Sequence, residues 1–299
     1  MTSASAMDLD VRRLHPVVGA EIGGIDLSQP LDDVRFLAIR QALSDHQVLV
    51  FRDQPLDQDQ LLAFGTRFGQ PEVFPDVNST QGKVPQVLRL TNLNAEGLPT
   101  GPGPEMARKS LAENWHSDSS YRAVPSYVTM LHGIEIPPIG GDTDFTSMHA
   151  SYEALPAELR ERVAPLSAVH NWEYQRDLSG KRAPMTEQER AGYPPVRHRL
   201  VQRHPDTGRK LLFISSSAEY IDGMPREEGR ALLAQLTKIV TEPALVYTHK
   251  WRKGDVVMWD NRATLHRSAG FDYQSLTLRR LLHRVVIGGD KAAYERVNA

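Results

Sequence analysis

The sequence predicts a mostly β protein: an antiparallel β-sandwich or barrel with helices packed against its outside. Three observations lead to this fold class. Short apolar runs with the composition of strands dominate the second half of the 299-residue chain. Helical periodicity is confined to a few segments. Strands and helices do not alternate regularly along the chain, so a parallel sheet is not indicated. The chain contains no internal repeat, so we expect a single domain over residues 1–299.

The first 70 residues contain the clearest local signals. Residues 12–31, "RRLHPVVGAEIGGIDLSQPL", are short apolar pieces broken by Gly and Pro, which indicates paired short strands. Residues 31–47 have apolar side chains at helical spacing, and "VLVFRD" follows as a buried strand. Residues 56–69 predict a second helix, with Asp57 as its N-cap and Gly69 ending it.

Composition changes after residue 75. The stretch "NAEGLPTGPGPEMARKS" is rich in Gly, Pro and polar residues, which favours a long loop. It leads directly into "ENWHSDSSY", so residues 75–112 are predicted to form a mobile lid over a site there.

The remaining elements alternate between strands and a few helices. Helices are predicted over residues 149–166 and 225–242. Strands are expected in the stretches "SYVTMLHGIEI", "DTDFTSM", "KLLFIS", "DVVMWD" and "LTLRRLLHRVVIG".

Charge and cysteine content exclude several classes of protein. The net charge of −2 favours neither a nucleic acid nor an anionic membrane as partner. No apolar run approaches the roughly 20 residues of a membrane-spanning helix, and "MTSASAMDLDVRR" lacks the apolar core of a signal peptide. We therefore expect a cytoplasmic protein. Because the chain has no cysteine, a bound metal ion must use histidine and carboxylate ligands.

A histidine and an acid two residues apart form the first half of a candidate metal site. On a strand, His116 and Asp118 of "NWHSDSSY" would point to the same side. His266 follows a strongly apolar strand and a polar Asp-Asn-Arg turn, which makes it the candidate third ligand. Two histidines and one carboxylate are the set that holds Fe(II) and leaves one face open.

Two other interpretations of these residues remain open. A zinc hydrolase would use the same three ligands and an activated water. A binding or structural β-sandwich would keep His116 and His266 as core histidines far from each other. His15, His198 and His204 are expected on the surface or as caps, and His132, His149, His170 and His249 are expected to be structural.

The last predicted strand presents two arginines on one face. In "RRLLHRVV", Arg280, Leu282 and Arg284 alternate onto one side. Guanidinium groups on an apolar strand need anions, either in structural salt bridges or in a ligand, and a guanidinium binds a carboxylate through two parallel hydrogen bonds. Thr143 in "GGDTDF" could donate a hydrogen bond to the same anion.

Taken in order, these motifs resemble the taurine dioxygenase family of Fe(II)- and 2-oxoglutarate-dependent dioxygenases. The resemblance extends over nearly the whole chain, through "HPVVGAEIGGIDLSQPL", "VLVFRDQPL", "WHSDSSY", "PPIGGDT", "HPDTGRKLLFI", "GDVVMWDNRATLHR" and "RRLLHRVVI". It is nearest to the phenoxyacetate (2,4-D) branch. It implies a double-stranded β-helix (jelly roll), with Fe(II), 2-oxoglutarate and O₂ as reactants.

The same resemblance implies roles for single residues. His116, Asp118 and His266 would bind iron, Thr143 and Arg280 would hold the far carboxylate of 2-oxoglutarate, and Arg284 would bind the substrate's acidic group. The substrate would be a small organic carboxylate, or alternatively a sulfonate or alkyl sulfate ester, and its hydroxylation could lead to C–O cleavage. We also expect a homo-oligomer. Further candidates for the substrate pocket are Asn78, Arg89, Asn94, Trp172 and Phe213.

Overall fold

The computed structural model describes residues 9–73, 84–101, 112–178, 184–273 and 275–298. The strands are β1 (Asp10–Arg13), β2 (Ala20–Gly23), β3 (Val48–Phe51), β4 (Leu88–Thr91), β5 (Val128–Glu135), β6 (Asp142–Ser147), β7 (Ser167–His170), β8 (Val196–Arg199), β9 (Val201–Arg203), β10 (Lys210–Leu212), β11 (Ala218–Ile221), β12 (Val246–His249), β13 (Val256–Asp260), β14 (Thr264–Ala269) and β15 (Leu281–Ile287). The helices are α1 (Asp33–His46), α2 (Gln58–Thr66), α4 (Met148–Ala154), α5 (Ala157–Val163), α6 (Trp172–Asp177), α7 (Glu187–Gly192), α8 (Arg226–Val240), the short 3₁₀ helix η1 (Pro243–Leu245) and α9 (Lys291–Asn298).

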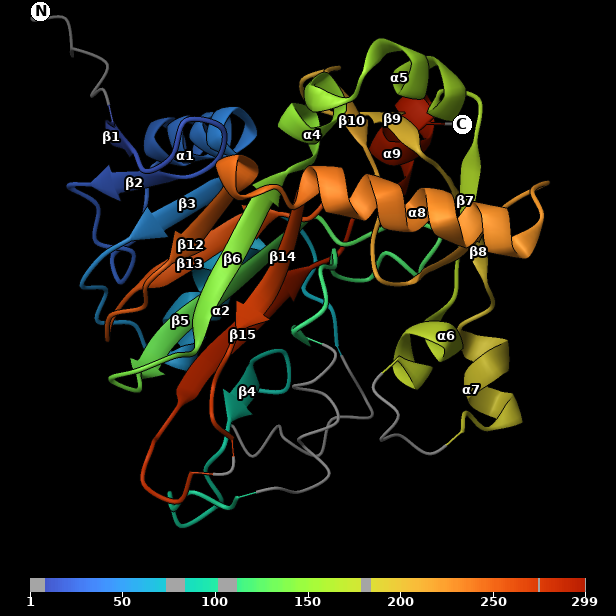
Figure 1. Ribbon diagram of the computed structural model, residues 1–299. Coiled ribbons are helices and arrows are strands. Elements are labelled where there is room, and N and C mark those ends of the chain that lie inside the picture. The colour runs from blue at the N-terminus through green and yellow to red at the C-terminus, as the bar shows by residue number, and fades with distance from the viewer. Residues whose placement is uncertain (1–8, 74–83, 102–111, 179–183, 274, 299) are drawn as a thin grey trace, which may run out of the picture.

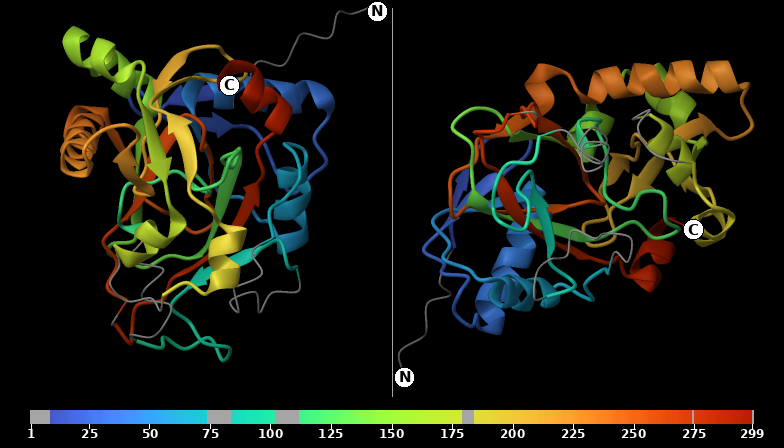
Figure 2. Two further views of the ribbon diagram at one scale, coloured as in Figure 1. Left: turned by 90° about the vertical axis from the view of Figure 1, so that its right-hand side faces the viewer. Right: turned by 90° about the horizontal axis from the view of Figure 1, so that it is seen from below.

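Two sheets face each other and form the centre of the molecule (Figures 1 and 2). The larger has the strand order β1-β2-β3-β13-β5-β15-β4, and the smaller has the order β12-β6-β14. All neighbours in these two sheets are antiparallel except β2 and β3. The predicted antiparallel sandwich or barrel with helices outside is therefore confirmed.

Side-chain alternation along the strands of the large sheet creates two different faces. In β13, Val256 and Met258 belong to the apolar cluster on the outer face of the sheet, which faces away from the small sheet. Val257 and Trp259 point toward the small sheet. Strand β3 divides in the same way. This period of two follows from the pleat of a strand. The face toward the small sheet, where Phe145 of β6 packs, is the one on which the functional side chains lie.

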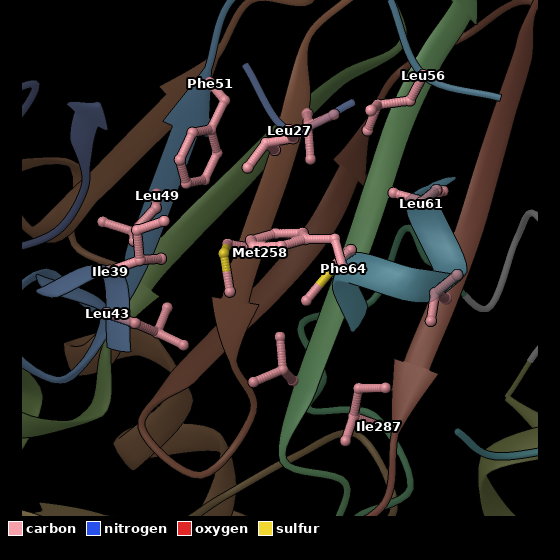
Figure 3. Packing of buried hydrophobic residues seen from close by; sticks show 14 of the residues in the cluster. Leu27, Ile39, Leu43, Leu49, Phe51, Leu56, Leu61, Phe64, Met258 and Ile287 are labelled. Carbon is pink, nitrogen blue, oxygen red and sulfur yellow. The ribbon is translucent and has the colours of Figure 1, made fainter. Parts of the chain in front are cut away.

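Helices α1 and α2 cover the outer face of the large sheet. Figure 3 shows Ile39 and Leu43 of α1 and Phe64 of α2 beside Leu49 and Met258 of the sheet. Asp57 caps α2 as predicted, because its side chain accepts from the backbone N–H of Gln60 in a capping box.

A second apolar cluster lies beside the small sheet. It joins α4, α5 and α8 to β7, β10 and β11. Helix α8, which crosses the upper part of Figure 1, buries one face that includes Leu232, Leu236 and Val240. Among the described residues, no helix is both long and apolar enough to span a bilayer.

Two predictions of helix bounds need correction. Helix α2 ends at Thr66 and not at Gly69. Residues 149–166 form two helices, because Leu155 precedes Pro156 and is extended. Strand β4 lies inside the segment predicted to be a lid. Since residues 74–83 and 102–111 are outside the described part of the chain, the lid and the single-domain organisation stay predictions.

A buried ionic network lies behind the turn between β13 and β14. Asp260 is paired with His204 (Nε2 to Oδ2, 3.0 Å) and with Arg262 (Nη2 to Oδ2, 2.6 Å). Arg262 also binds Asp206 at 2.7 Å and lies 3.8 Å from the Tyr127 ring centroid. His204 was expected on the surface or as a cap. It is buried, although its Nδ1 does accept hydrogen bonds from the turn that follows it.

We predict that Asp260→Asn lowers the free energy of unfolding by about 3–5 kcal/mol, because it leaves Arg262 as a buried cation with a weaker partner. Urea denaturation measures the change. Asp33→Asn is the matched control, because the Asp33–Arg67 pair is on the surface and its carboxylate is 93% exposed. Equal stability of the Asp260 variant and the wild type would contradict this account of the network.

Candidate functional site

Two backbone hydrogen bonds bring His116 and His266 together. The N–H of His116 donates to the carbonyl of His266 (3.0 Å), and the N–H of His266 donates to the carbonyl of His116 (2.8 Å). The two rings are consequently 4.1 Å apart, centroid to centroid. A structural β-sandwich with these histidines far apart is ruled out.

Asp118 completes the cluster. One of its carboxylate oxygens lies 3.8 Å from Nε2 of His116, and the other lies 3.8 Å from Nε2 of His266. All three potential ligand atoms are within 4.8 Å of one another. The shared direction of His116 and Asp118 was predicted from a strand. In the structure only His116 makes a β-bridge, and Asp118 begins a turn in which Ser119 has a φ of 53°.

Each ring is oriented by its own surroundings. Nδ1 of His116 lies 2.8 Å from the carbonyl oxygen of Asn114 and can donate to it, which leaves the lone pair on Nε2 facing Asp118. The ring of His266 packs against Trp259 (4.6 Å) and Phe145 (6.1 Å). Apolar residues between the sheets thus hold the His266 ring, and a main-chain carbonyl orients the His116 ring.

The electrostatics of the cluster suit a divalent cation. Burial lowers the pKa of His116, and burial together with His116 lowers the pKa of His266 well below its ordinary value. Burial alone would raise the pKa of Asp118, but Arg284 and the histidines outweigh it and lower that pKa. Neutral imidazoles beside an ionised carboxylate are the protonation states in which these groups bind metals.

Arg284 lies at this cluster and not in solvent. Its Nη2 is 2.7 Å from Oδ1 of Asp118. The predicted alternation is confirmed here, because Leu282 belongs to the apolar cluster between the sheets, and Arg284, two residues on, reaches Asp118 on that same side.

Arg280 enters the space between the sheets without an acidic partner. Its side chain is 7% exposed, and no Asp or Glu of the described chain is within salt-bridge distance of it. Its Nη2 donates to the carbonyl of Gly141 at 3.3 Å, and its buried Nε has no hydrogen-bond partner in the described residues. A side chain at Gly141 would place a Cβ 3.0 Å from Nε, so glycine allows this approach.

Thr143 is buried on β6, two residues after Gly141. Its Oγ accepts a hydrogen bond from Nε1 of Trp251 at 3.0 Å. Because this bond uses a lone pair of the oxygen, the hydroxyl proton of Thr143 remains available to an anion.

The other described pocket candidates make contacts of their own outside the His116–Asp118–His266 cluster. Phe213 is in the second apolar cluster, and Asn94 closes a turn by accepting from the N–H of Leu98. Arg89 lies opposite His283 in the pairing of β4 with β15. Because the next residue, Arg284, reaches Asp118 on the inner face, His283 and Arg89 are on the outer face. Trp172 stacks on Tyr121 with ring centroids 4.4 Å apart. Asn78 is outside the described residues.

Sequence reasoning missed two residues that contact Asp118. Thr129 of β5 donates to Oδ2 of Asp118 at 2.6 Å, and Asn261 accepts from the N–H of Asp118 at 3.2 Å. The polar "WDN" turn was a visible signal for Asn261. The sequence contains no such signal for Thr129, because a threonine in a strand is common and does not indicate a functional role.

A second group of possible metal ligands is already neutralised. His204, Asp206 and Asp260 are close enough to bind an ion. The guanidinium of Arg262 lies between the two carboxylates, and Arg40 also pairs with Asp206 at 3.4 Å, so two cations balance the two carboxylates within the protein.

Comparison with known proteins agrees with this geometry. The family model described as "Taurine catabolism dioxygenase TauD, TfdA family" matches residues 10–286. An alpha-ketoglutarate-dependent 2,4-dichlorophenoxyacetate dioxygenase of Burkholderia sp. (strain RASC) is 37% identical over 287 residues, which are 95% of each chain. An alpha-ketoglutarate-dependent sulfate ester dioxygenase of Pseudomonas putida is 31% identical over 296 residues, 97% of this chain and 92% of the relative.

A solved structure agrees as well. AAD-2 in complex with Mn(II) and N-oxalylglycine has a TM-score of 0.85 and 34% identity, and covers 95% of this chain and 98% of its own.

The chain belongs to the TauD/TfdA family of dioxygenases. It is accordingly a 2-oxoglutarate-dependent non-haem iron dioxygenase with Fe(II), 2-oxoglutarate and O₂ as its cofactor and co-substrates. The predicted jelly-roll fold is confirmed by the structural match, and the membership decides against the zinc hydrolase.

Proposed function

We propose that this dioxygenase hydroxylates a small anionic organic substrate, with a carboxylate as the preferred acid group. His116, Asp118 and His266 hold Fe(II), Thr143 and Arg280 hold the far carboxylate of 2-oxoglutarate, and Arg284 binds the acid group of the substrate. The observation that supports this best is the buried guanidinium of Arg280, which lacks an acidic partner in the described residues. Burying such a cation is costly unless a ligand neutralises it.

The donor set fits Fe(II). Two neutral imidazoles and one carboxylate leave positions open on the metal, and the described chain offers no further His, Asp or Glu at this cluster. A dicarboxylate fits beside it, because Arg280 and the hydroxyl of Thr143 both have hydrogen-bonding capacity left.

When bound, iron and 2-oxoglutarate activate O₂, so that one oxygen atom enters the substrate as hydroxyl and the other enters succinate, with release of CO₂. The task of the protein is to position the reactants and exclude water. Trp259 and Phe145 wall the site on the side of His266. Arg284 and Arg280 supply two separate cationic contacts, one at Asp118 and one beside Gly141.

The names of two relatives support an anionic substrate and leave two kinds of acid group as candidates for it. One is named for a phenoxyacetate, which is a carboxylate, and the other for sulfate esters. A guanidinium binds either group. If the hydroxylated carbon bears an ether or ester oxygen, the product collapses with cleavage of the C–O bond.

A homo-oligomer and a cytoplasmic location stay predictions. Size-exclusion chromatography with light scattering would test the first.

We predict that His266→Ala abolishes specific Mn(II) binding, measured by anaerobic calorimetric titration, because only two of the three ligands remain. His46→Ala is the control, since this partly buried histidine is at the end of α1 and outside the cluster. Wild-type Mn(II) affinity in His266→Ala would show that the wrong histidine had been chosen.

Arg280→Ala should raise the KM for 2-oxoglutarate at least about 30-fold, which corresponds to the roughly 2 kcal/mol lower bound for removing one partner of a buried charge pair. Mn(II) affinity should stay nearly unchanged. Arg279→Ala is a matched control, because the neighbouring guanidinium pairs with Glu135 and is 44% exposed. The assignment fails if both variants have the same KM.

Substrate class can be tested by succinate release in the presence of small carboxylates, sulfonates, alkyl sulfates and the alcohols matching each acid. We expect stimulation by acids and little by alcohols, and Arg284→Lys should raise the KM for the best acid by about tenfold or more, because lysine cannot bind it bidentately. Alcohols that work as well as acids would overturn the proposal of an anionic substrate. Mn(II) titration of Arg284→Lys separates this effect from any damage at Asp118.

A further inference from the structure

The side chain of Asn261 is fixed by three hydrogen bonds. Its Oδ1 accepts from the backbone N–H of Asp118 (3.2 Å) and from Nε1 of Trp259 (2.9 Å), and its Nδ2 donates to Oγ of Thr129 (2.9 Å). Both contacts to Oδ1 come from N–H donors. A flipped amide would lose both of these bonds and would draw the Thr129 hydroxyl proton away from Asp118, so the neighbours determine the orientation of Asn261.

This orientation fixes the direction of the next hydrogen bond. Oγ of Thr129 accepts a hydrogen bond from Nδ2 of Asn261, so the hydroxyl proton of Thr129 is free to be donated. It lies 2.6 Å from Oδ2 of Asp118, which is ionised and can only accept. The chain of donors therefore runs from Asn261 through Thr129 to the carboxylate.

The backbone of Asn261 adds a contact to the same segment. Its carbonyl accepts from Oγ of Ser117 at 2.6 Å, and its N–H donates to the carbonyl of Tyr127 at 2.8 Å. Asn261 is in the turn that joins β13 to β14, and β14 contains His266. One residue thus connects the His116–Asp118 segment, β5 and the strand of the third ligand.

The carboxylate of Asp118 is held from two sides. Arg284 contacts Oδ1 and Thr129 contacts Oδ2, while each oxygen keeps a further lone pair. All groups of the Thr129 side are buried: Asn261 and Thr129 are 0% exposed and Trp259 is 1% exposed. Without the Thr129 contact, only the ion pair with Arg284 would determine the rotation of the carboxylate.

We propose that Thr129 and Asn261 are positioning residues that set the carboxylate of Asp118 for the metal before the metal arrives. The inference rests on the proposed role of Asp118 as a ligand and assigns a function to two residues that do not touch the ion. Partners of this kind, one shell removed from a metal, typically change its affinity 10- to 100-fold when lost.

The test is calorimetric titration with Mn(II), without O₂, 2-oxoglutarate or substrate, so that binding and not turnover is measured. Thr129→Val keeps the shape of the side chain and removes the donor, and it should weaken Mn(II) binding about 10- to 100-fold. Thr129→Ser restores the hydroxyl and should bind within about threefold of wild type, which a purely steric role would not require.

Thr146→Val is the matched control. Thr146 is also a fully buried strand threonine, and its hydroxyl donates to the carbonyl of Val240, at the end of α8 and away from the cluster. This variant should be less thermally stable but should bind Mn(II) as the wild type does. It separates loss of a buried hydrogen bond in general from loss of the bond to Asp118.

Asn261→Ala should weaken Mn(II) binding in the same range or more, because it removes the donor that orients the Thr129 hydroxyl and also the acceptor of the Asp118 N–H. In the double variant with Thr129→Val the two effects should be less than additive, because they share the Asn261–Thr129 bond. Circular dichroism checks that each variant is folded. Wild-type affinity in a folded Thr129→Val would overturn the inference while leaving the ligand assignment intact. Failure of the ligand assignment itself would show instead as unchanged Mn(II) binding in His266→Ala.

Discussion

The reciprocal pair of backbone hydrogen bonds between His116 and His266 is the constraint on which the site depends. It joins a segment before β5 to the middle of β14, and neither segment could place its imidazole correctly alone. Main-chain bonds of this kind leave little freedom in the relative position of the two Cα atoms. The ring orientations are then set locally, by the Asn114 carbonyl for one ring and by packing on Trp259 for the other.

The charges in the interior follow from the same arrangement. A carboxylate between two sheets of apolar residues is expensive to bury, and Asp118 is compensated by Arg284, Thr129 and its own N–H bond to Asn261. Removal of one partner would leave a buried charge poorly satisfied. Fixed donors therefore offset the cost of burying an ionised Asp118.

Sequence patterns predicted the parts of the site that obey simple periodicity. Strand alternation put Leu282 and Arg284 on one face as predicted, whereas Arg280 lies just before the strand. Spacing brought His116 and Asp118 together, although Asp118 begins a turn. For His204 the expected cap is present but the surface position is wrong, because "HPDTG" has the composition of an exposed turn. The turn is indeed at the surface, but Asp260 from a distant strand binds the imidazole inside. Thr129 could not be found, since its importance depends on the partner facing it across the interior and not on its own segment.

Arg280, which immediately precedes β15, and Arg284, which is inside it, have different surroundings. Arg284 already has a carboxylate at 2.7 Å, whereas Arg280 donates to a neutral carbonyl and keeps Nε without a partner in the described chain. A buried guanidinium with spare donors attracts an incoming anion strongly, and one engaged by Asp118 attracts it less, because part of its charge is balanced. This difference is the reason for assigning the proposed dicarboxylate to Arg280 and not to Arg284. If the acid group of a substrate binds at Arg284, as proposed, it shares that guanidinium with Asp118.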